Sequence, residues 1–285
     1  MISMNSVRKL GSVIALSVMA SAAFAQNSTP PGSYAIPADG AAYADVADLV
    51  TIAPLIIDAQ IVKASKVPPE QSVGVPPALQ RMLIEANVLA LIRGQNGVAP
   101  AVKFLLDVPK DAKGKLPKLK KARFFMMANQ VIGRPGEIRL VRPGALVANS
   151  PTNDAMVRAI TKEAVQIDAP PSITGITSAF YTPGTVLGDG DTQIFLTTDN
   201  NQPMALSITS RAGQPKKWSV SNSELIEESA TVPAHFTLIW YRLACGLPRA
   251  LPAELVETSQ SDDAARAQAD YKFVIDALGL CGRKR

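Results

Sequence analysis

The chain has 285 residues, of which 47% are hydrophobic and 19% are charged, and this balance predicts a packed globular fold and excludes a disordered chain. The formal net charge is +5, a mild excess that does not indicate nucleic-acid binding. Aromatic residues make up only 5%, so we expect a core built mostly from Val, Ile, Leu and Ala.

The first 25 residues have the pattern of a signal peptide. Arg8 and Lys9 precede an apolar segment at 10–22, and Ala23-Phe24-Ala25 has the A-x-A form of a cleavage site. The alternative, a signal anchor, needs about 20 apolar residues to span a bilayer, and this segment is shorter. We therefore predict cleavage after Ala25, a periplasmic location, and no membrane span in the mature chain.

The next part of the chain predicts a leader followed by a barrel. Residues 26–40 are rich in Pro, Ser and Gly, which is typical of a flexible leader. Within residues 41–148, five segments alternate apolar and polar residues with a period of two, as half-buried strands do. Five strands that each have one apolar face need closure or a second layer. A small five-stranded barrel of OB type is the simplest solution.

The strand order adds a resemblance. A strand after ADLV, a long strand that ends at Arg93-Gly94, and the strands VKFLLDV and ARFFMMA resemble the netrin/tissue-inhibitor-type OB barrel of secreted proteins. The resemblance covers roughly residues 45–145. The metalloproteinase inhibitors of that family use an N-terminal Cys to reach the metal. This segment contains no Cys, so the resemblance does not imply such inhibition here.

Six lysines cluster between the third and fourth predicted strands. They are Lys110, Lys113, Lys115, Lys118, Lys120 and Lys121. One interpretation is a solvated hairpin that keeps a sheet edge soluble. The other is contact with an anionic envelope component such as lipopolysaccharide, through Lys118, Lys120 and Lys121. Nucleic acid is not expected, because Phe104 and Phe124 fall on the apolar face and only Phe125 is left for base stacking.

Residues 149–285 predict an α+β domain. An amphipathic helix at 154–165 precedes a three- or four-stranded antiparallel meander, and 221–224 fit a capping box. An almost wholly apolar helix is expected at 233–245, and a final amphipathic helix at 262–278 with a C-cap at Gly279. The predicted fold class is therefore α+β, with an OB-like barrel followed by a meander packed with two or three helices.

The two cysteines, Cys245 and Cys281, lie near the ends of these last two helices. An oxidising compartment favours a disulfide between them, which would join the two helix ends. Two free buried thiols are the alternative.

Few residues could carry chemistry. His235 is the only histidine, so a serine or cysteine triad would have to use it, and there is no G-x-S-x-G. Asp189 and Asp191 in Gly-Asp-Gly-Asp could ligate a cation, but the following residues do not continue a calcium loop, and a plain turn is the alternative. No P-loop, dinucleotide fingerprint or His/Cys cluster is present, so we predict no catalytic set, no metal and no cofactor.

A second resemblance covers the C-terminal half. The segments GDGDTQIFL, W-x-V-S and TLIWYRLAC resemble a group of uncharacterised exported proteins of Gram-negative bacteria. That group implies a compartment and no mechanism. We predict a non-enzymatic periplasmic binding or structural module whose partner is a periplasmic protein or an envelope component. The alternatives are a hydrolase with a polar site at Asp189, Asp191 and His235, and an envelope-surface binder that uses the lysines at 110–121.

Overall fold

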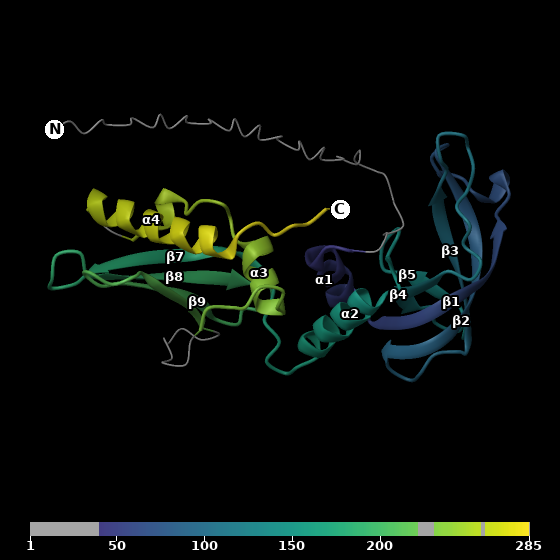
Figure 1. The fold of residues 1–285 in the computed structure, drawn as a ribbon, viewed down its shortest axis with the longest axis horizontal. Coiled ribbons are helices and arrows are strands. Elements are labelled where there is room, and N and C mark those ends of the chain that lie inside the picture. The colour runs from purple at the N-terminus through teal and green to yellow at the C-terminus, as the bar shows by residue number, and fades with distance from the viewer. Residues whose placement is uncertain (1–39, 222–230, 258–259, 285) are drawn as a thin grey trace, which may run out of the picture. The chain divides into compact units, whose positions relative to one another are not determined.

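The computed structural model describes residues 40–221, 231–257 and 260–284. The predicted signal peptide, nearly all of the predicted leader and residues 222–224 of the predicted capping box lie outside the described residues. The described part contains four α-helices and ten strands, and the strands form two antiparallel sheets (Figure 1). The predicted α+β class is confirmed. No helix in this part is long and apolar enough to cross a membrane.

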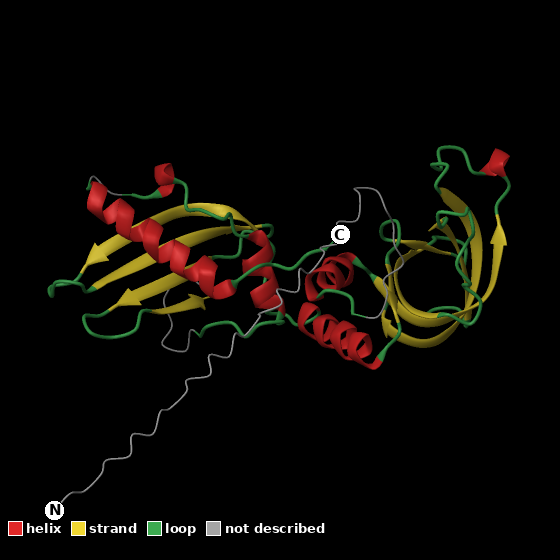
Figure 2. Ribbon diagram, turned by 45° about the horizontal axis from the view of Figure 1, so that its top comes forward, coloured by secondary structure: helices red, strands yellow, loops and turns green. Residues whose placement is uncertain are grey.

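The first sheet is a nearly closed barrel. Its main strands are β1 (Leu55–Lys66), β2 (Leu79–Arg93), β3 (Ala101–Pro109), β4 (Arg123–Gln130) and β5 (Ile138–Leu140). In the sheet they lie in the order β3-β2-β1-β4-β5, and a short strand, β6 (Leu146–Ala148), also pairs with β4. A parallel bridge between Lys103 and Glu137, with Lys103 N donating to Gly136 O at 2.7 Å, joins β3 to the start of β5. Figure 2 shows the strands curving into a ring.

The apolar side chains of the alternating pattern in the sequence fill the interior of this barrel. Side chains on a strand point to opposite faces in turn, so Ile57, Ala59 and Ile61 of β1 enter the interior and are fully buried. Phe124 enters the interior as expected. Phe125, on the other face of β4, is also fully buried, because it belongs to a second core with two helices. These helices are α1 (Tyr43–Ile52) and α2 (Pro151–Ala164).

The second sheet is an antiparallel meander in the order β10-β9-β8-β7. Its strands are β7 (Ile173–Pro183), β8 (Gly190–Thr198), β9 (Met204–Ser210) and β10 (Lys217–Ser221). The helix α4 (Ser261–Leu278) lies along this sheet and contacts β7 (Figure 1). One-turn helices, η1 (Pro69–Gln71) and η2 (Ala253–Leu255), complete the described elements.

The helix α3 (Leu238–Gly246) begins later than predicted. Thr237 is its N-cap, and the Thr237 hydroxyl accepts a hydrogen bond from Trp240 N at 3.3 Å. Phe236 has a φ of 61°, which a right-handed helix does not allow. The predicted start at Pro233 is therefore wrong by five residues. The apolar residues begin before the helix does, and the positive φ of Phe236 interrupts the helical backbone conformation.

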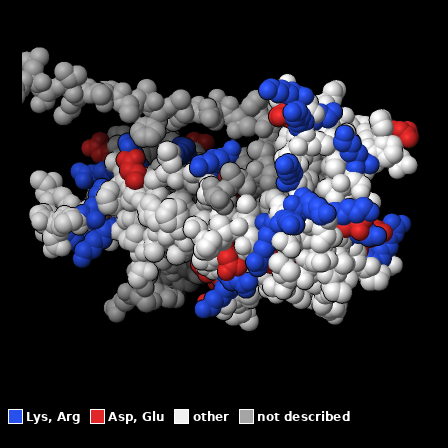
Figure 3. All heavy atoms as spheres, turned by 45° about the vertical axis from the view of Figure 1, so that its right-hand side comes forward, with Lys and Arg blue, Asp and Glu red and all other residues white. Residues whose placement is uncertain are grey.

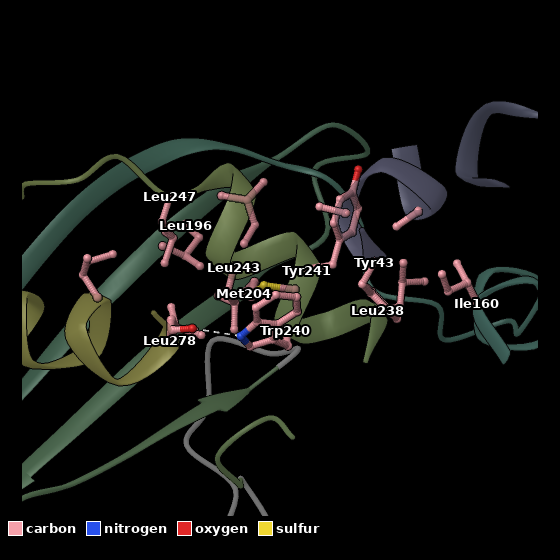
Figure 4. Close-up of a cluster of buried hydrophobic side chains, with 14 of the residues drawn as sticks. Tyr43, Ile160, Leu196, Met204, Leu238, Trp240, Tyr241, Leu243, Leu247 and Leu278 are labelled. Carbon is pink, nitrogen blue, oxygen red and sulfur yellow. Dashed lines mark hydrogen bonds between the residues drawn. The ribbon is translucent and has the colours of Figure 1, made fainter. Parts of the chain in front are cut away.

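The core around α3 contains residues from both sides of the predicted boundary between residues 148 and 149. The helix contacts α1, α2, α4 and β7. Trp240 is 3% exposed, and its indole N–H donates to Leu278 O at 3.0 Å (Figure 4). Tyr43 of α1 packs against the Trp240 ring at 6.0 Å between centroids. This helix therefore lies at the centre of the larger hydrophobic cluster.

Candidate functional site

The lysine loop, residues 110–121, has a backbone fixed by its own contacts. Asp111 Oδ1 accepts hydrogen bonds from the backbone N–H groups of Lys113 and Lys115, both at 2.8 Å. Leu119 is 5% exposed and packs into the barrel interior. Lys121 N donates to Ile61 O at 2.8 Å, which ties the end of the loop to β1. At the other end, Lys110 N donates to Ala78 O at 2.9 Å, so the loop is attached to the barrel at both ends.

Five of the six lysines of the loop are exposed to solvent. Lys113, Lys115, Lys118, Lys120 and Lys121 are exposed, and none takes part in an ion pair recorded among the described residues. Asp111, the only acidic residue of the loop, is occupied by the backbone hydrogen bonds above. Within the described ranges, the loop therefore presents five ammonium groups that are not paired with a carboxylate.

The barrel around the loop is strongly basic. Residues 55–148 contain fifteen Lys and Arg and six Asp and Glu, a net charge of +9. Residues 149–285 contain twelve basic and fifteen acidic residues, a net charge of −3. Four of the six barrel acids are held in ion pairs, by Arg123, Lys63, Arg81 and Arg134. Figure 3, in which the barrel side comes forward, shows many Lys and Arg side chains and few carboxylates.

This asymmetry is readable in the sequence but does not appear in the whole-chain charge. The +5 total combines +9 from residues 55–148, −3 from residues 149–285 and −1 from residues 1–54. Counting charge separately for each predicted segment gives the signal.

Asp189 and Asp191 lie where two turns meet. Asp189 Oδ1 accepts a hydrogen bond from Ala212 N at 2.7 Å. Asp191 forms an ion pair with Arg211 at 3.1 Å, and both side chains are more than 40% exposed. No group of three or more potential metal ligands occurs in the described ranges. Both aspartates therefore have contacts that join the β7–β8 turn to the β9–β10 turn.

His235 lies in a different environment. Its ring stacks on Trp240, with centroids 5.3 Å apart, and meets the edge of Phe236. None of its recorded contacts involves Asp189 or Asp191. The structure therefore brings the two aspartates together and places the histidine on the aromatic cluster before α3.

The predicted disulfide is confirmed: Cys245 is bonded to Cys281, and no described cysteine is free. It joins the end of α3 to the segment after α4. Two residues later, Arg283 makes a bidentate pair with Asp48 of α1, in which Nε donates to Oδ2 and Nη2 donates to Oδ1, both at 2.8 Å. Tyr241 of α3 also donates its hydroxyl to Asp48 Oδ1 at 2.5 Å.

These contacts shift two pKa values in opposite directions. Burial alone would raise the pKa of Asp48, but hydrogen bonds from Arg283 and Tyr241, with the charges of Arg283 and Arg142, outweigh it and lower that pKa below its ordinary value. Burial, followed by the hydrogen bond to Asp48, raises the pKa of Tyr241 to about 12. Asp48 is therefore a carboxylate and Tyr241 a hydrogen-bond donor across the neutral range.

Replacing Asp48 with Asn is expected to lower the free energy of unfolding at pH 7 by about 1–2 kcal/mol, because one carboxylate and its charged hydrogen bonds are lost. The Asp48 side chain is 14% exposed and Arg283 39% exposed, so solvent screening keeps the effect below that of a buried pair. The native pKa lies below the unfolded one of about 3.9, so this stability is present above that pH and lost as pH falls through the native pKa.

Urea denaturation of both proteins from neutral pH to about pH 2 checks this expectation. The difference between wild type and Asp48→Asn should shrink as the pH falls below about 4. Asp276→Asn is the control, because Asp276 is 63% exposed and pairs with Lys272 on the surface. A gap that stays constant over the whole range would contradict a role for the ionised carboxylate.

Sequence reasoning also missed a buried carboxylate on α4. Asp270 is 3% exposed, pairs with Lys216 and accepts a hydrogen bond from the Thr192 hydroxyl at 2.5 Å. The contacts attach α4 to the loop before β10 and to the centre of the sheet. The sequence signal that could have identified it is the position of Asp270 next to the apolar stripe of the helix.

No family model matches the chain, and a search of curated proteins found no match.

Proposed function

We propose that the protein is an exported, non-enzymatic binding module whose barrel docks on lipopolysaccharide phosphates through the lysine loop. The observation that carries the proposal is the group of five exposed lysines on a fixed loop, without ion pairs among the described residues, in a barrel of net charge +9. Lysine ammonium groups bind phosphate as point charges. A surface of one sign attracts the opposite charge over about a Debye length, roughly 10 Å at 0.1 M salt.

A loop that serves only solubility would not need a fixed backbone. Here Asp111 and Leu119 order the segment before any partner arrives. Ordering in advance reduces the conformational entropy lost on binding. The lysine loop therefore combines a concentrated charge with a defined shape, which favours docking over simple solvation.

The barrel type and the compartment belong to the same proposal. An OB barrel is supported by the central position of β1 between β2 and β4, and by the parallel bridge from β3 to the start of β5. Export to the periplasm rests on the N-terminal signal pattern. The disulfide is consistent with an oxidising compartment. The hydrolase alternative gains no support, since His235 has no recorded contact with Asp189 or Asp191.

Replacing Lys118, Lys120 and Lys121 with Ala should weaken binding to lipopolysaccharide-containing vesicles about 100-fold at low salt. A basic side chain near an anionic membrane surface contributes about 1 kcal/mol, so three contribute about 3 kcal/mol, or two decades in the dissociation constant. Vesicle co-sedimentation over a series of salt concentrations measures the effect.

The matched control removes the same charge elsewhere, with Lys162, Lys217 and Lys272 replaced by Ala. Its binding should stay within a few-fold of wild type, and circular dichroism should confirm that both triple variants are folded. Salt-independent binding, or an equal loss in the two triple variants, would rule out docking through the lysine loop.

A further inference from the structure

A pocket of about 560 Å³ lies away from the lysine loop. Its lining comes from α1, the segment between β5 and β6, the start of β7, the turn between β8 and β9, α3 and the C-terminal tail. The charged groups in the lining are Asp48, Arg142, Asp199, Arg242 and Arg283. The volume falls in the range of small-molecule sites, about 300–1,000 Å³.

Both carboxylates of the pocket already have partners. Asp48 accepts the two hydrogen bonds of Arg283 and the hydroxyl of Tyr241. Asp199 Oδ1 accepts a hydrogen bond from Ser172 N at 3.0 Å. Three guanidinium groups face two carboxylates, so the lining has a net charge of +1. With Asp48 and Arg283 paired, the net charge of +1 comes from Arg142 and Arg242 together with Asp199.

Arg142 is incompletely paired. Its Nη2 is buried and has no hydrogen-bond partner among the described residues. A buried donor without an acceptor costs free energy, so native structures rarely keep one. Arg142 acts on Asp48 through its charge but makes no recorded hydrogen bond to it. Arg142 also lines the pocket and is only half-buried, so its positive charge is available to an anion bound there.

Arg242 is held in place from one side. Its Nε donates to Pro170 O at 3.2 Å, and its guanidinium lies 5.5 Å from the centre of the Tyr241 ring. Within the part of the chain that the structure describes, its two terminal nitrogens make no hydrogen bond. A guanidinium fork matches the two oxygens of a carboxylate or phosphate. The side chains of Ile52 and Ile173 add apolar surface to the lining.

We propose that this pocket binds the oxyanion group of a small organic solute, a carboxylate or a phosphate, with Arg142 and Arg242 as the donors. The organic part of the solute would lie against Ile52 and Ile173. Arg283 and Tyr241 act as positioning residues, because they occupy Asp48 and keep it from pairing with Arg142. The site is independent of the lysine loop.

Titration calorimetry of the full chain with succinate and with inorganic phosphate tests the proposal. We expect saturable binding of at least one anion, weakened about ten- to hundred-fold in Arg142→Met and in Arg242→Met. Arg142→Lys should also bind weakly, because it keeps the charge but loses the fork. Binding of succinate alone would assign a carboxylate ligand, and binding of phosphate alone a phosphate ligand.

Two controls separate the site from general charge effects. Arg158→Met removes a charge from the exposed face of α2 and should bind like wild type. The triple lysine variant of the loop should also bind like wild type. Arg142→Met should unfold at an unchanged or higher temperature without ligand, because it removes an unsatisfied group. No saturable binding with a dissociation constant below about 10 mM, or full binding by Arg142→Met and Arg242→Met, would overturn the proposal.

Discussion

Replacing Cys245 and Cys281 together with Ala is expected to lower the free energy of unfolding by about 4 kcal/mol. The two cysteines are 36 positions apart, so the bridge closes a long loop and restricts the unfolded chain. A loss of this size is a large share of the roughly 5–15 kcal/mol that stabilises a typical domain. Urea denaturation of the oxidised wild type and the double variant at pH 7 measures it.

The bridge should also control the C-terminal tail. Arg283 follows Cys281 by two residues and pairs with Asp48 on α1. Without the bridge, the C-terminal segment has more conformational freedom to lose when Arg283 pairs with Asp48. The effect of Asp48→Asn should therefore be smaller in the double Ala variant than in the oxidised protein, which a double-mutant cycle would detect as coupling.

Reduction provides the matched control for the disulfide. A reductant should lower the denaturation midpoint of the wild type to near that of the double Ala variant, and should not change the variant. Equal midpoints for oxidised and reduced wild type would contradict the expected stabilisation, and would mean that packing around α3 and α4 holds the two segments together without the bond.

The sequence was most informative where the pattern is local. The period-two alternation in β1 predicted which residues enter the barrel, because successive side chains of a strand point to opposite faces of the sheet. Ile57, Ala59 and Ile61 are all buried inside. The disulfide was predicted from another kind of evidence, since two cysteines after a signal pattern leave one intramolecular pairing.

Long-range pairings were not predictable from the sequence. Asp48 and Arg283 are 235 positions apart, and no pattern near either residue points to the other. Arg142 likewise enters the pocket only through the fold. The face of β4 that carries Phe125 was predicted to lie outside the barrel core, but nothing local showed that α1 and α2 would cover it. The start of α3 was missed because the left-handed Phe236 leaves no trace in hydrophobicity.

Replacing Trp240 with Ala should lower the free energy of unfolding by about 3–5 kcal/mol. The side chain is 3% exposed and contacts Tyr43, His235 and Phe236. Its removal leaves a cavity and also deprives Leu278 O of its indole donor. Trp240→Phe keeps most of the apolar volume and loses the donor, so it should cost about 1–2 kcal/mol.

Phe236→Ala is the matched control, because Phe236 meets the same indole ring but is 65% exposed. Its cost should be below about 1 kcal/mol. If Trp240→Ala were no more destabilising than Trp240→Phe, the cluster would be able to collapse around the missing ring, and the close packing of α3 would be disproved.

The same variant tests whether the barrel and the meander unfold together. Trp240 contacts Tyr43 on one side of the predicted domain boundary and Leu278 on the other. In Trp240→Ala, Trp218 on β10 is the remaining tryptophan and reports the second sheet through its fluorescence. Far-ultraviolet circular dichroism reports both sheets. If α3 couples the two, wild type should show coincident transitions by both probes, and they should separate in Trp240→Ala, because the side chain that packs α1 against the C-terminal helices has been removed.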